Sequence, residues 1–494
     1  MEKYKNLIGG KLVGPENGKY FNNLNPADNT DLIGLFPDSG IKDIENAVKE
    51  AAKALILWKD MPAPKRGELI YRTAELLTKY KEKLAKVIVR EMGKTMPEAM
   101  GDVQSSIDVA YFTAGEGRRM YGQTTSSALN RRWALTKRTP VGICGLITAW
   151  NAPMAIVTWK LFPALICGNT VVLKPSEEVP LSAYLLGDTL KEAGFPEGVV
   201  NIIYGSGSEA AEALVRHPKV RLISFTGSTH VGRLISEECG RQIKRCSLEL
   251  GGKNGLIVMD NADLDSAAKA AAAGAFSSAG QRCASTSRVF IHKDVYNIFM
   301  KKLILQTKKM KVGPGNNHDT MVCPIINQRQ FGKIVDFIKE GKRSGARLVY
   351  GGKVLRAGRL AKGNFIEPTI FSNVDINSRL AQEEIFGPVL CVFKINSFDE
   401  AIEKINSVEY GLTASIFTSD VNMAILALEK IEAGRCYVNA PTFGSEPHMP
   451  FGGLKNSGNG MREPGLQALD VFSEWKTVYI DYSGVAQNSQ FRTK

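Results

Sequence analysis

The sequence predicts an α/β protein built from two successive parallel-sheet domains. The chain has 494 residues, which is longer than a single hydrophobic core usually supports. From residue 140 onward, short apolar runs alternate with helical patterns, and a second alternation begins after Gly252. Near-continuous apolar strands separated by helices are typical of parallel sheets whose faces are covered by helices.

The first quarter of the chain predicts three long helices. Their expected ranges are 41–58, 65–92 and 96–121. Within the second range, Leu69, Leu77, Leu84 and Ile88 recur at helical spacing, so they form one apolar face. We interpret this face as core packing.

Between residues 140 and 251 the pattern predicts five strands separated by helices. The expected strands are 142–148, 170–174, 199–204, 221–225 and 246–250, and the expected helices are 182–193, 208–217 and 229–239. Ligands of such sheets bind beyond the carboxyl ends of the strands.

The second alternation predicts another α/β domain that continues to about residue 453. It opens with an expected strand at 256–259, a helix at 264–278, a strand at 289–292 and a helix at 295–310. Two segments, 123–137 and 472–482, belong to neither domain. The later segment is rich in aromatic and β-branched residues, which favours a strand.

Composition argues against several classes of protein. The formal charge is +13, but Lys and Arg are dispersed, which indicates a solvated surface and no nucleic-acid partner. The eight cysteines include no C-x-x-C pair, and the five histidines have no metal-binding spacing. We therefore expect reduced thiols and no metal site. No apolar run reaches membrane-spanning length, so we expect a cytoplasmic protein without a membrane partner.

Cys283 is the candidate nucleophile. It follows Gly280 at the end of an alanine-rich helical pattern, and Glu249 lies in a second segment that contains Gly251 and Gly252. A thiol and a distant carboxylate, each beside glycines that permit close approach of a ligand, predict covalent catalysis with a separate general base. A lone cysteine is more often a small buried hydrophobe, so the prediction depends on the rest of the sequence.

Two glycine-containing turns are candidates for nucleotide binding. Residues 205–210 fit G-x-G-x-x-[GA] between a strand and a helix, but no acidic residue follows at the usual distance, so this turn alone is weak. Gly227 and Ser228 follow a strand and open a helix, where backbone N–H groups and a hydroxyl can meet a pyrophosphate. Ser228 also reads as an ordinary helix N-cap.

Three polar residues stand at other informative positions. Asn151 follows the strand at 142–148, where its amide could donate to an oxyanion or cap a turn. Lys174 ends an apolar strand, a position at which lysine is usually just exposed. Glu384, in Glu384-Ile385-Phe386-Gly387-Pro388, could equally cap a helix.

Taken together, these segments resemble the aldehyde dehydrogenase superfamily. The resemblance is carried by the motifs around Asn151, Lys174, Ser228, Glu249, Cys283 and Glu384, which occur in the family order. It covers nearly the whole chain, from about residue 24 to residue 477. It implies a catalytic set of Cys283, Glu249 and Asn151.

The resemblance also implies a nicotinamide cofactor, NAD, with NADP as the alternative. The implied cofactor residues are Ile147, Thr148, Trp150, Lys174, Ser176, Glu177, Gly207, Gly227, Ser228, Leu250, Glu384 and Phe386. Glu177 would accept a hydrogen bond from the ribose 2′-hydroxyl and repel a 2′-phosphate, which favours NAD. Trp159 and Arg282 would line the substrate channel, although Ala152 stands where the family more often has an aromatic residue.

The same resemblance divides the chain. It implies a Rossmann-like NAD(P)-binding domain at 1–122 and 141–251, an α/β catalytic domain at 252–454, and a small β oligomerisation element at 123–140 and 455–494. We accordingly expect a homodimer or a homotetramer.

The expected reaction oxidises an aldehyde to a carboxylic acid through a Cys283 thiohemiacetal and thioester, with Glu249 activating water. Two alternatives are a CoA-acylating enzyme and a catalytically silent binding or structural protein on this fold. Glu249 favours hydrolysis. The segments 439–444 and 449–453 resemble the 2-oxoglutarate semialdehyde branch, so we expect a short polar or anionic aldehyde.

Overall fold

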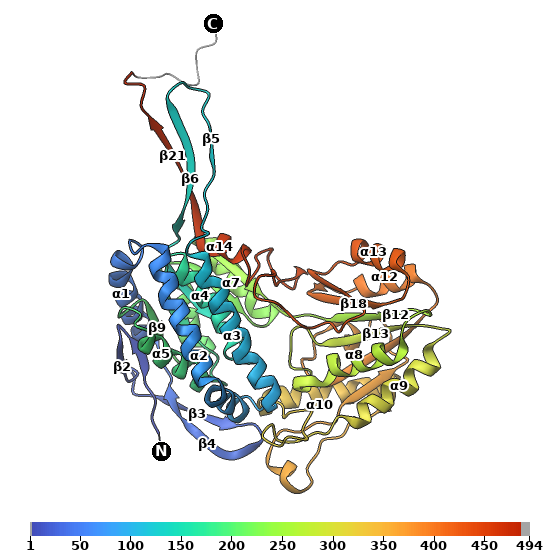
Figure 1. Cartoon of the computed structure of the whole chain (residues 1–494). Helices are drawn as coiled ribbons and strands as arrows, with labels where there is room; N and C mark the ends of the chain where they lie inside the picture. Colours follow the sequence, from blue (N-terminus) through green and yellow to red (C-terminus); the bar gives the residue numbers. More distant parts are fainter. Residues whose placement is uncertain (1, 486–494) are drawn as a thin grey trace.

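The computed structural model describes residues 2–485 and consists of two α/β units and a projecting arm (Figure 1). Each unit contains a seven-stranded sheet, and the arm is a three-stranded sheet. The predicted fold class, α/β with two successive and mainly parallel sheets, is thereby confirmed. Within the described residues, we find no helix whose length and apolar character would allow it to span a membrane.

The first sheet has the order β11-β10-β7-β8-β9-β1-β2. Its strands are β1 (Asn6–Ile8), β2 (Lys11–Val13), β7 (Ile143–Ile147), β8 (Thr170–Lys174), β9 (Val200–Ile202), β10 (Val220–Thr226) and β11 (Arg245–Glu249). The five strands from β11 to β9 pair in parallel, and Ile147 lies opposite both Lys174 and Phe225. Because Thr226 also lies opposite Glu249, the carboxyl ends of these strands form one edge of the sheet.

The α-helices of this unit that precede residue 252 are α1 (Ile41–Trp58), α2 (Ala63–Glu91), α3 (Met96–Glu116), α4 (Ala155–Ile166), α5 (Pro180–Ala193), α6 (Glu212–Arg216) and α7 (Thr229–Arg241). A π-helical turn, η1 (Gly207–Ala211), precedes α6. The apolar faces of α2 and α3 meet α4 in one hydrophobic core. The N-terminal hairpin of β3 (Tyr20–Asn25) and β4 (Asp28–Pro37) packs beside α2.

The second sheet has the order β14-β15-β16-β13-β12-β18-β19, and only β14 runs antiparallel to its neighbour. Its strands are β12 (Asn254–Val258), β13 (Thr286–His292), β14 (Arg347–Tyr350), β15 (Thr369–Ser372), β16 (Val389–Ile395), β18 (Thr413–Phe417) and β19 (Arg435–Val438). The helices are α8 (Leu264–Phe276), α9 (Tyr296–Lys309), α10 (Gln328–Arg343), α11 (Arg379–Gln382), α12 (Phe398–Asn406) and α13 (Val421–Lys430). A short ladder joins β17 (Tyr410–Gly411) to β20 (Leu454–Lys455).

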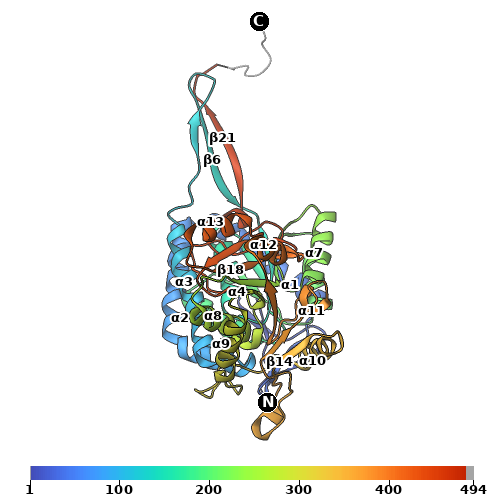
Figure 2. The ribbon, with the colours of Figure 1, turned by 90° about the vertical axis from the view of Figure 1, so that its right-hand side faces the viewer.

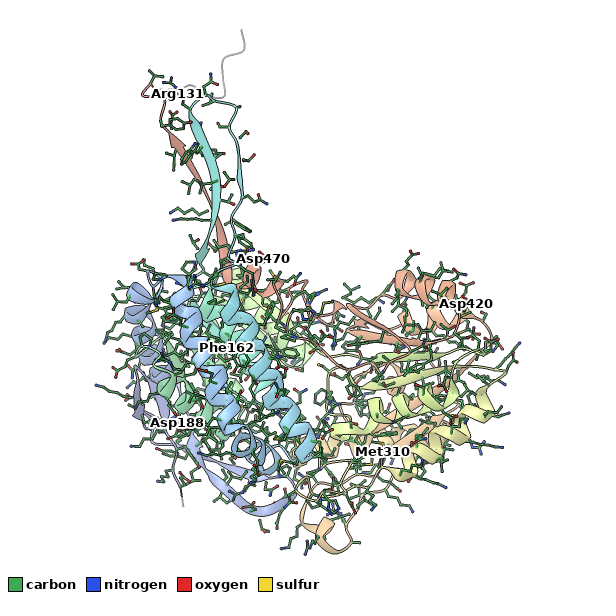
Figure 3. All side chains as sticks on the ribbon, viewed as in Figure 1. Arg131, Phe162, Asp188, Met310, Asp420 and Asp470 are labelled. Carbon is green, nitrogen blue, oxygen red and sulfur yellow. The ribbon has the colours of Figure 1, made fainter. Side chains whose placement is uncertain are left out.

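The arm consists of β5 (Thr124–Ser126), β6 (Arg132–Pro140) and β21 (Ser473–Asp481). β6 pairs antiparallel with both other strands, and the arm points away from the two units in both views (Figures 1 and 2). Arg131 lies near its tip and Asp470 at its base (Figure 3). Two segments far apart in the sequence are therefore joined in one ladder.

The segment 455–494 divides at Ser473. Before that residue, α14 (Gln467–Phe472) packs on α4 and contributes Leu469 and Phe472 to the core of the first unit. Residues 455–472 are thus not strands of the arm, although we expected them in the oligomerisation element. Residues 486–494 lie outside the described part of the chain.

Three local predictions differ from the structure. Helix α4 was not predicted because residues 155–166 are almost all apolar and buried, so no amphipathic period exists there. The third helix ends at Glu116 rather than at residue 121, with Gly117 as its C-cap. The expected helix at 208–217 is divided between η1 and α6.

The loop that carries Cys283 has an unusual backbone. After α8, Ser278, Ala279 and Gly280 all have positive φ, at 50°, 53° and 68°. A Cβ added at Gly280 would lie 2.2 Å from the carbonyl oxygen of Gly387. Only glycine satisfies both the left-handed conformation and the close approach at this position.

Gly280→Ala should therefore destabilise the protein by about 1–3 kcal/mol, because the substitution adds backbone strain and a backbone collision. Thermal unfolding followed by fluorescence measures this loss. Gly332→Ala is the matched control: Gly332 lies in α10, where an added Cβ meets no atom within 4 Å. Equal melting temperatures for the two variants would contradict the assigned loop conformation.

Candidate active site

Asn254 fixes the backbone of the nucleophile loop. Its side-chain Nδ2 donates to the carbonyl oxygens of Cys283, at 2.6 Å, and Ser285, at 2.8 Å. Its Oδ1 accepts from the backbone N–H of Thr413, at 3.2 Å. One amide at the start of β12 thus holds the loop against β18 and the remainder of the second sheet.

The opposite side of this loop is held by the first unit. Glu98, in the first turn of α3, accepts hydrogen bonds from the backbone N–H of Ser278, at 2.7 Å, and from the Arg282 guanidinium, at 3.0 Å. The same carboxylate accepts from Thr95 and so completes the capping box of α3. The loop is therefore anchored in both units.

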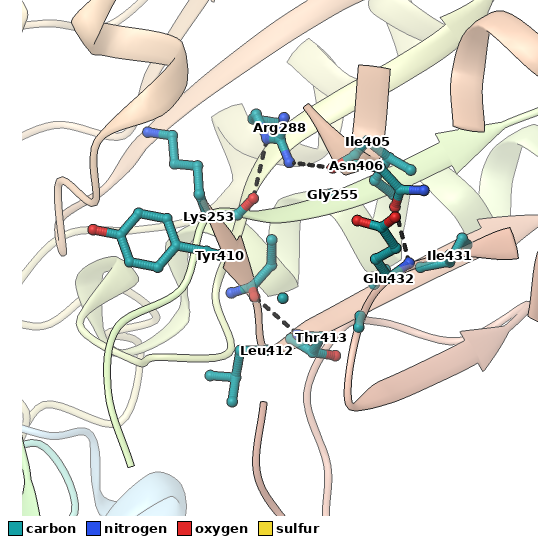
Figure 4. A pocket seen from close by; sticks show the side chains of 14 residues that line it. Lys253, Gly255, Arg288, Ile405, Asn406, Tyr410, Leu412, Thr413, Ile431 and Glu432 are labelled. Atoms are coloured by element: carbon teal, nitrogen blue, oxygen red, sulfur yellow. Dashed lines mark hydrogen bonds between the residues drawn. The ribbon is translucent and has the colours of Figure 1, made fainter. Parts of the chain in front are cut away.

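A small cavity of about 10 Å³ lies behind the loop, with Lys253, Asn254 and Arg288 in its wall (Figure 4). Buried Arg288 donates to the carbonyl oxygens of Lys253 and Ile405, at 3.0 and 2.8 Å. The cavity has room for about one water molecule. It is too small to hold a substrate.

Glu249 ends β11 and is buried. Neither carboxylate oxygen has a hydrogen-bond partner among the described residues. A Cβ added at Gly452 would lie 2.8 Å from Glu249 Oε1, so this glycine leaves space beside the carboxylate. Burial and the neighbouring Glu463 raise the pKa of Glu249 well above its ordinary value, and Lys160, Arg462 and Arg435 oppose this rise.

A buried polar network lies behind Glu249. Lys160 of α4 donates to Glu463 at 2.7 Å, and both side chains are almost fully buried. Glu463 also accepts from the hydroxyls of Ser224, at 2.8 Å, and Ser247, at 2.7 Å. We did not predict these residues. A lysine inside the apolar run 154–166 was the available signal, whereas nothing in the sequence distinguished Glu463.

The pKa of the Cys283 thiol is also shifted by burial and by nearby charged groups. The residue is partly exposed, but burial of its thiol, together with Glu384 and Glu249, raises the pKa to about 12. Arg435 acts in the opposite direction. The charge of Glu249 therefore acts on the Cys283 thiol, and the catalytic pairing of these two residues stays a prediction.

Asn151 lies in the turn between β7 and α4 and is buried. Among residues 2–485, no partner satisfies its side-chain amide. The backbone N–H of Ala155 in the next turn donates to Asp102 of α3, at 2.8 Å. Because Glu98 in the same helix holds the nucleophile loop, α3 positions both the Asn151 turn and Cys283.

The predicted adenosine side of the cofactor site follows the carboxyl ends of the first sheet. Lys174 forms an ion pair with Glu177 at 3.1 Å, and Ser176 lies between them in the chain. Ser228 caps α7, since its hydroxyl accepts from the N–H of Val231 at 3.3 Å. An added Cβ at Gly207 meets no atom within 4 Å, so a ligand can approach the backbone there.

The predicted nicotinamide side lies where Glu384 meets the first unit. Glu384 accepts from the N–H of Gly252 at 3.0 Å, and a Cβ on Gly251 would collide with its carboxylate. Trp150 and Phe386 pack edge to face at 5.2 Å. The half-buried Glu384, the open Gly207 and the α7 N-terminus together fit an elongated dinucleotide that crosses from one unit to the other.

The remaining predicted cofactor residues occupy the same sheet edge. Ile147 ends β7, and the N–H of Thr148 donates to the carbonyl oxygen of Lys174 at 3.3 Å. Gly227 donates to the carbonyl oxygen of Glu249 at 3.1 Å, and the N–H of Leu250 donates to the carbonyl oxygen of Ser457 at 3.0 Å. These contacts fix the backbone around the site.

The two predicted channel residues have different surroundings. Trp159 donates from its indole N–H to Ser105 at 3.0 Å and packs on Phe451 at 5.2 Å. Arg282 is already paired with Glu98 and lies over the ring of Phe443 at 4.8 Å. Its charge is therefore compensated within the protein.

One group of potential metal ligands occurs in the described residues. Asp260, His292 and Asp294 have ligand atoms within 4.8 Å of one another. They follow the carboxyl ends of β12 and β13, whereas Asn254 and the Cys283 loop lie at the beginnings of these strands. This group, with two exposed carboxylates, is separate from the candidate active site.

Comparison with known proteins agrees with this geometry. A sequence model of the aldehyde dehydrogenase family matches residues 13–478. The alpha-ketoglutaric semialdehyde dehydrogenase of Bacillus subtilis is 39% identical over 477 residues, which cover 97% of this chain and 98% of that protein.

Two solved structures are similar over nearly their whole length. The betaine aldehyde dehydrogenase of Staphylococcus aureus in complex with NAD⁺ has a TM-score of 0.95 at 31% identity and covers 99% of this chain and 98% of its own. A 3,6-anhydro-L-galactose dehydrogenase in complex with NADP has a TM-score of 0.94 at 33% identity, with coverages of 97% and 100%.

The chain belongs to the aldehyde dehydrogenase family. It is an NAD(P)-dependent oxidoreductase that converts aldehydes to carboxylic acids. The predicted family, enzyme class and nicotinamide cofactor are thereby confirmed.

The thiol environment predicts a particular pH dependence. In the cofactor-free protein, the alkylation rate of Cys283 by iodoacetamide should rise about tenfold per pH unit from pH 7 to pH 9.5, because the reactive thiolate forms only as the pH approaches the raised pKa. Mass spectrometry of the Cys283 peptide measures the rate. Urea-unfolded protein is the control, and its rate should level off above about pH 9. A plateau below pH 8.5 in the folded protein would refute the assigned environment.

Proposed function

We propose that the enzyme oxidises a short anionic aldehyde, with Cys283 as nucleophile, Glu249 as general base and Asn151 as oxyanion donor. The observation that carries this proposal is the buried Glu249 carboxylate, which has no described hydrogen-bond partner and acts electrostatically on the Cys283 thiol. A buried carboxylate of raised pKa that no described protein donor occupies is suited to accept a proton from water.

In the first step, the Cys283 sulfur forms a bond with the aldehyde carbon, and the carbonyl electron pair moves to oxygen. The Asn151 amide and the Cys283 backbone N–H are the proposed donors to this oxyanion. The thiol proton passes to solvent, directly or through Glu249, so that the Glu249 carboxylate is again ionised when it acts on water. The low-dielectric surroundings of the site strengthen each of these interactions.

When bound, NAD(P)⁺ supplies the acceptor for the hydride that leaves the thiohemiacetal carbon. The proposed cofactor residues are those named from the sequence, with Lys174 and Glu177 on the adenosine ribose, and Glu384 and Phe386 on the nicotinamide side. Cys283 then carries a thioester. Glu249 takes a proton from water as the oxygen attacks the acyl carbon, and the Cys283 thiolate departs with the acid as product.

We favour hydrolysis over acyl transfer to CoA because the Glu249 carboxylate has no described protein donor and is therefore available to activate water. The direct test is NADH formation from a panel of aldehydes with and without CoA. Dependence on CoA would support the acylating alternative, and no turnover with any aldehyde would support a silent protein.

The preferred substrate class rests on two supports. The segment 439–444 resembles the semialdehyde branch, and the Bacillus subtilis relative is named for alpha-ketoglutaric semialdehyde. Faster turnover of an uncharged aldehyde than of a semialdehyde of equal length would exclude this substrate class.

We also propose that the enzyme is a homo-oligomer, a dimer or tetramer, assembled through the arm. Trp133, Trp475, Tyr479 and Tyr482 of the arm are 51–60% exposed, and apolar exposure of this kind marks interaction surfaces. Sedimentation of a Trp475→Glu variant as the same oligomer as wild type would contradict this assembly.

We also propose a cytoplasmic location. The eight free cysteines favour a reducing compartment, and cell fractionation tests this location.

Glu249→Gln should separate the two halves of the reaction. Thioester formation should persist, giving a burst of about one NADH per active site, while steady-state kcat falls by about 10²–10⁴-fold because water is no longer activated. Stopped-flow absorbance at 340 nm measures both phases. Unchanged steady-state turnover would remove Glu249 from the role of base, and loss of the burst would assign it to an earlier step.

NAD should give a higher kcat/KM than NADP. Lys174 holds the pKa of Glu177 below its ordinary value despite partial burial, so Glu177 is ionised and repels a 2′-phosphate. Glu177→Gln should narrow the preference by about tenfold, since it removes one like charge. Glu367→Gln, in the second unit, is the control and should leave the preference unchanged. A wild-type preference for NADP would contradict this assignment.

A further inference from the structure

Two arginines, Arg282 and Arg435, lie close to the Cys283 loop. They differ in whether a carboxylate of the protein neutralises their charge. Arg282 precedes the nucleophile but is paired with Glu98 at 3.0 Å. Arg435, at the start of β19, forms no ion pair with any carboxylate of residues 2–485. A half-buried cation without a carboxylate partner has already lost part of its hydration. Binding of an anionic ligand beside the catalytic site would therefore stabilise it.

Packing places Arg435 beside the predicted substrate channel. Its guanidinium lies over the ring of Phe451 at 4.6 Å, and Phe451 packs on Trp159 at 5.2 Å. Two glycines bring the backbones together there: a Cβ at Gly434 would lie 2.0 Å from the carbonyl oxygen of Gly452. Trp159, Phe451 and Arg435 therefore form one continuous wall.

The guanidinium is oriented by a tyrosine. Arg435 donates to the hydroxyl of Tyr437, and that hydroxyl donates to the carbonyl oxygen of Gly444 at 2.6 Å. The charge of Arg435 also reaches the reacting groups. It lowers the pKa of both Cys283 and Glu249, acting against the effect of burial.

We propose that Arg435 binds the distal carboxylate of an anionic aldehyde while the carbonyl group of that aldehyde faces Cys283. This inference rests on the proposed function and identifies the residue that selects the substrate class. A planar guanidinium with free N–H groups matches a carboxylate in geometry, whereas a neutral substrate end gains no charge-assisted contact. Arg282 is excluded from this role because Glu98 already occupies its guanidinium.

The test compares two aldehydes that differ in charge but hardly in length: succinate semialdehyde and its uncharged methyl ester, methyl 4-oxobutanoate. The ratio of their kcat/KM values is the readout. An effect of Arg435 on the thiol or on folding alters both values together and leaves the ratio unchanged, so the ratio isolates recognition of the carboxylate.

For the wild-type enzyme we expect a ratio of about ten to one hundred in favour of the anionic aldehyde, the range for one charge-assisted contact. Arg435→Gln should bring the ratio close to one, mainly through KM for succinate semialdehyde. Arg435→Lys should give an intermediate ratio, because lysine keeps the positive charge but lacks the paired N–H groups with which a guanidinium binds both oxygens of a carboxylate. The matched control, Arg282→Gln, should retain the wild-type ratio.

The possible outcomes distinguish a wrong substrate class from a wrong role for Arg435. A wild-type preference for the methyl ester overturns the proposed substrate class and, with it, the role of Arg435. A wild-type preference for the anion that survives in Arg435→Gln overturns only the role of Arg435. A loss of preference in Arg282→Gln would assign recognition to the other cation. If Arg435→Gln fails to fold, an unchanged ratio in Arg435→Lys still refutes the bidentate contact.

Discussion

The active site depends on the simultaneous attachment of one loop to both α/β units. Asn254 binds the carbonyl oxygens of Cys283 and Ser285 from the second sheet, and Glu98 binds the N–H of Ser278 from the first unit. Between these anchors the backbone passes through three consecutive residues with positive φ. Such strain persists only where the surroundings determine the conformation, and here they fix the position of the nucleophile.

Two glutamates near the site, Glu249 and Glu463, differ in how well the protein satisfies their carboxylates with hydrogen bonds, and this difference sets their chemical roles. The buried Glu249 carboxylate has no hydrogen-bond partner in residues 2–485, whereas Glu463 accepts from Lys160 and from two serine hydroxyls. Burial, and after it the charge of Glu463, raises the pKa of Glu249, so this carboxylate is a stronger base than an exposed glutamate. Two carboxylates in one region thus have different tasks because their environments differ.

Elements that show a local hydrophobic period or a short motif could be predicted from the sequence. It predicted the strand 170–174, a strand at 246–250 that matches β11 to within one residue, the capped α7 and the nucleophile Cys283. It was not sufficient for features made by contacts between distant segments. Helix α4 lacks polarity on any face, Lys160 meets Glu463 only after folding, and the compensation of Arg282 by Glu98 depends on how α3 meets the loop. Such long-range partners leave no period in one sequence.

In the proposed mechanism, the first unit supplies the base for an acyl group that the second unit carries. Rapid-quench mass spectrometry tests it most directly, because trypsin releases Cys283 in the short peptide 283–288. With NAD⁺ and an aldehyde, Glu249→Gln should accumulate this peptide with the mass of one acyl group, while the wild-type enzyme shows only a transient. An acyl adduct on another residue, or equal decay of the adduct in both proteins, would contradict the account.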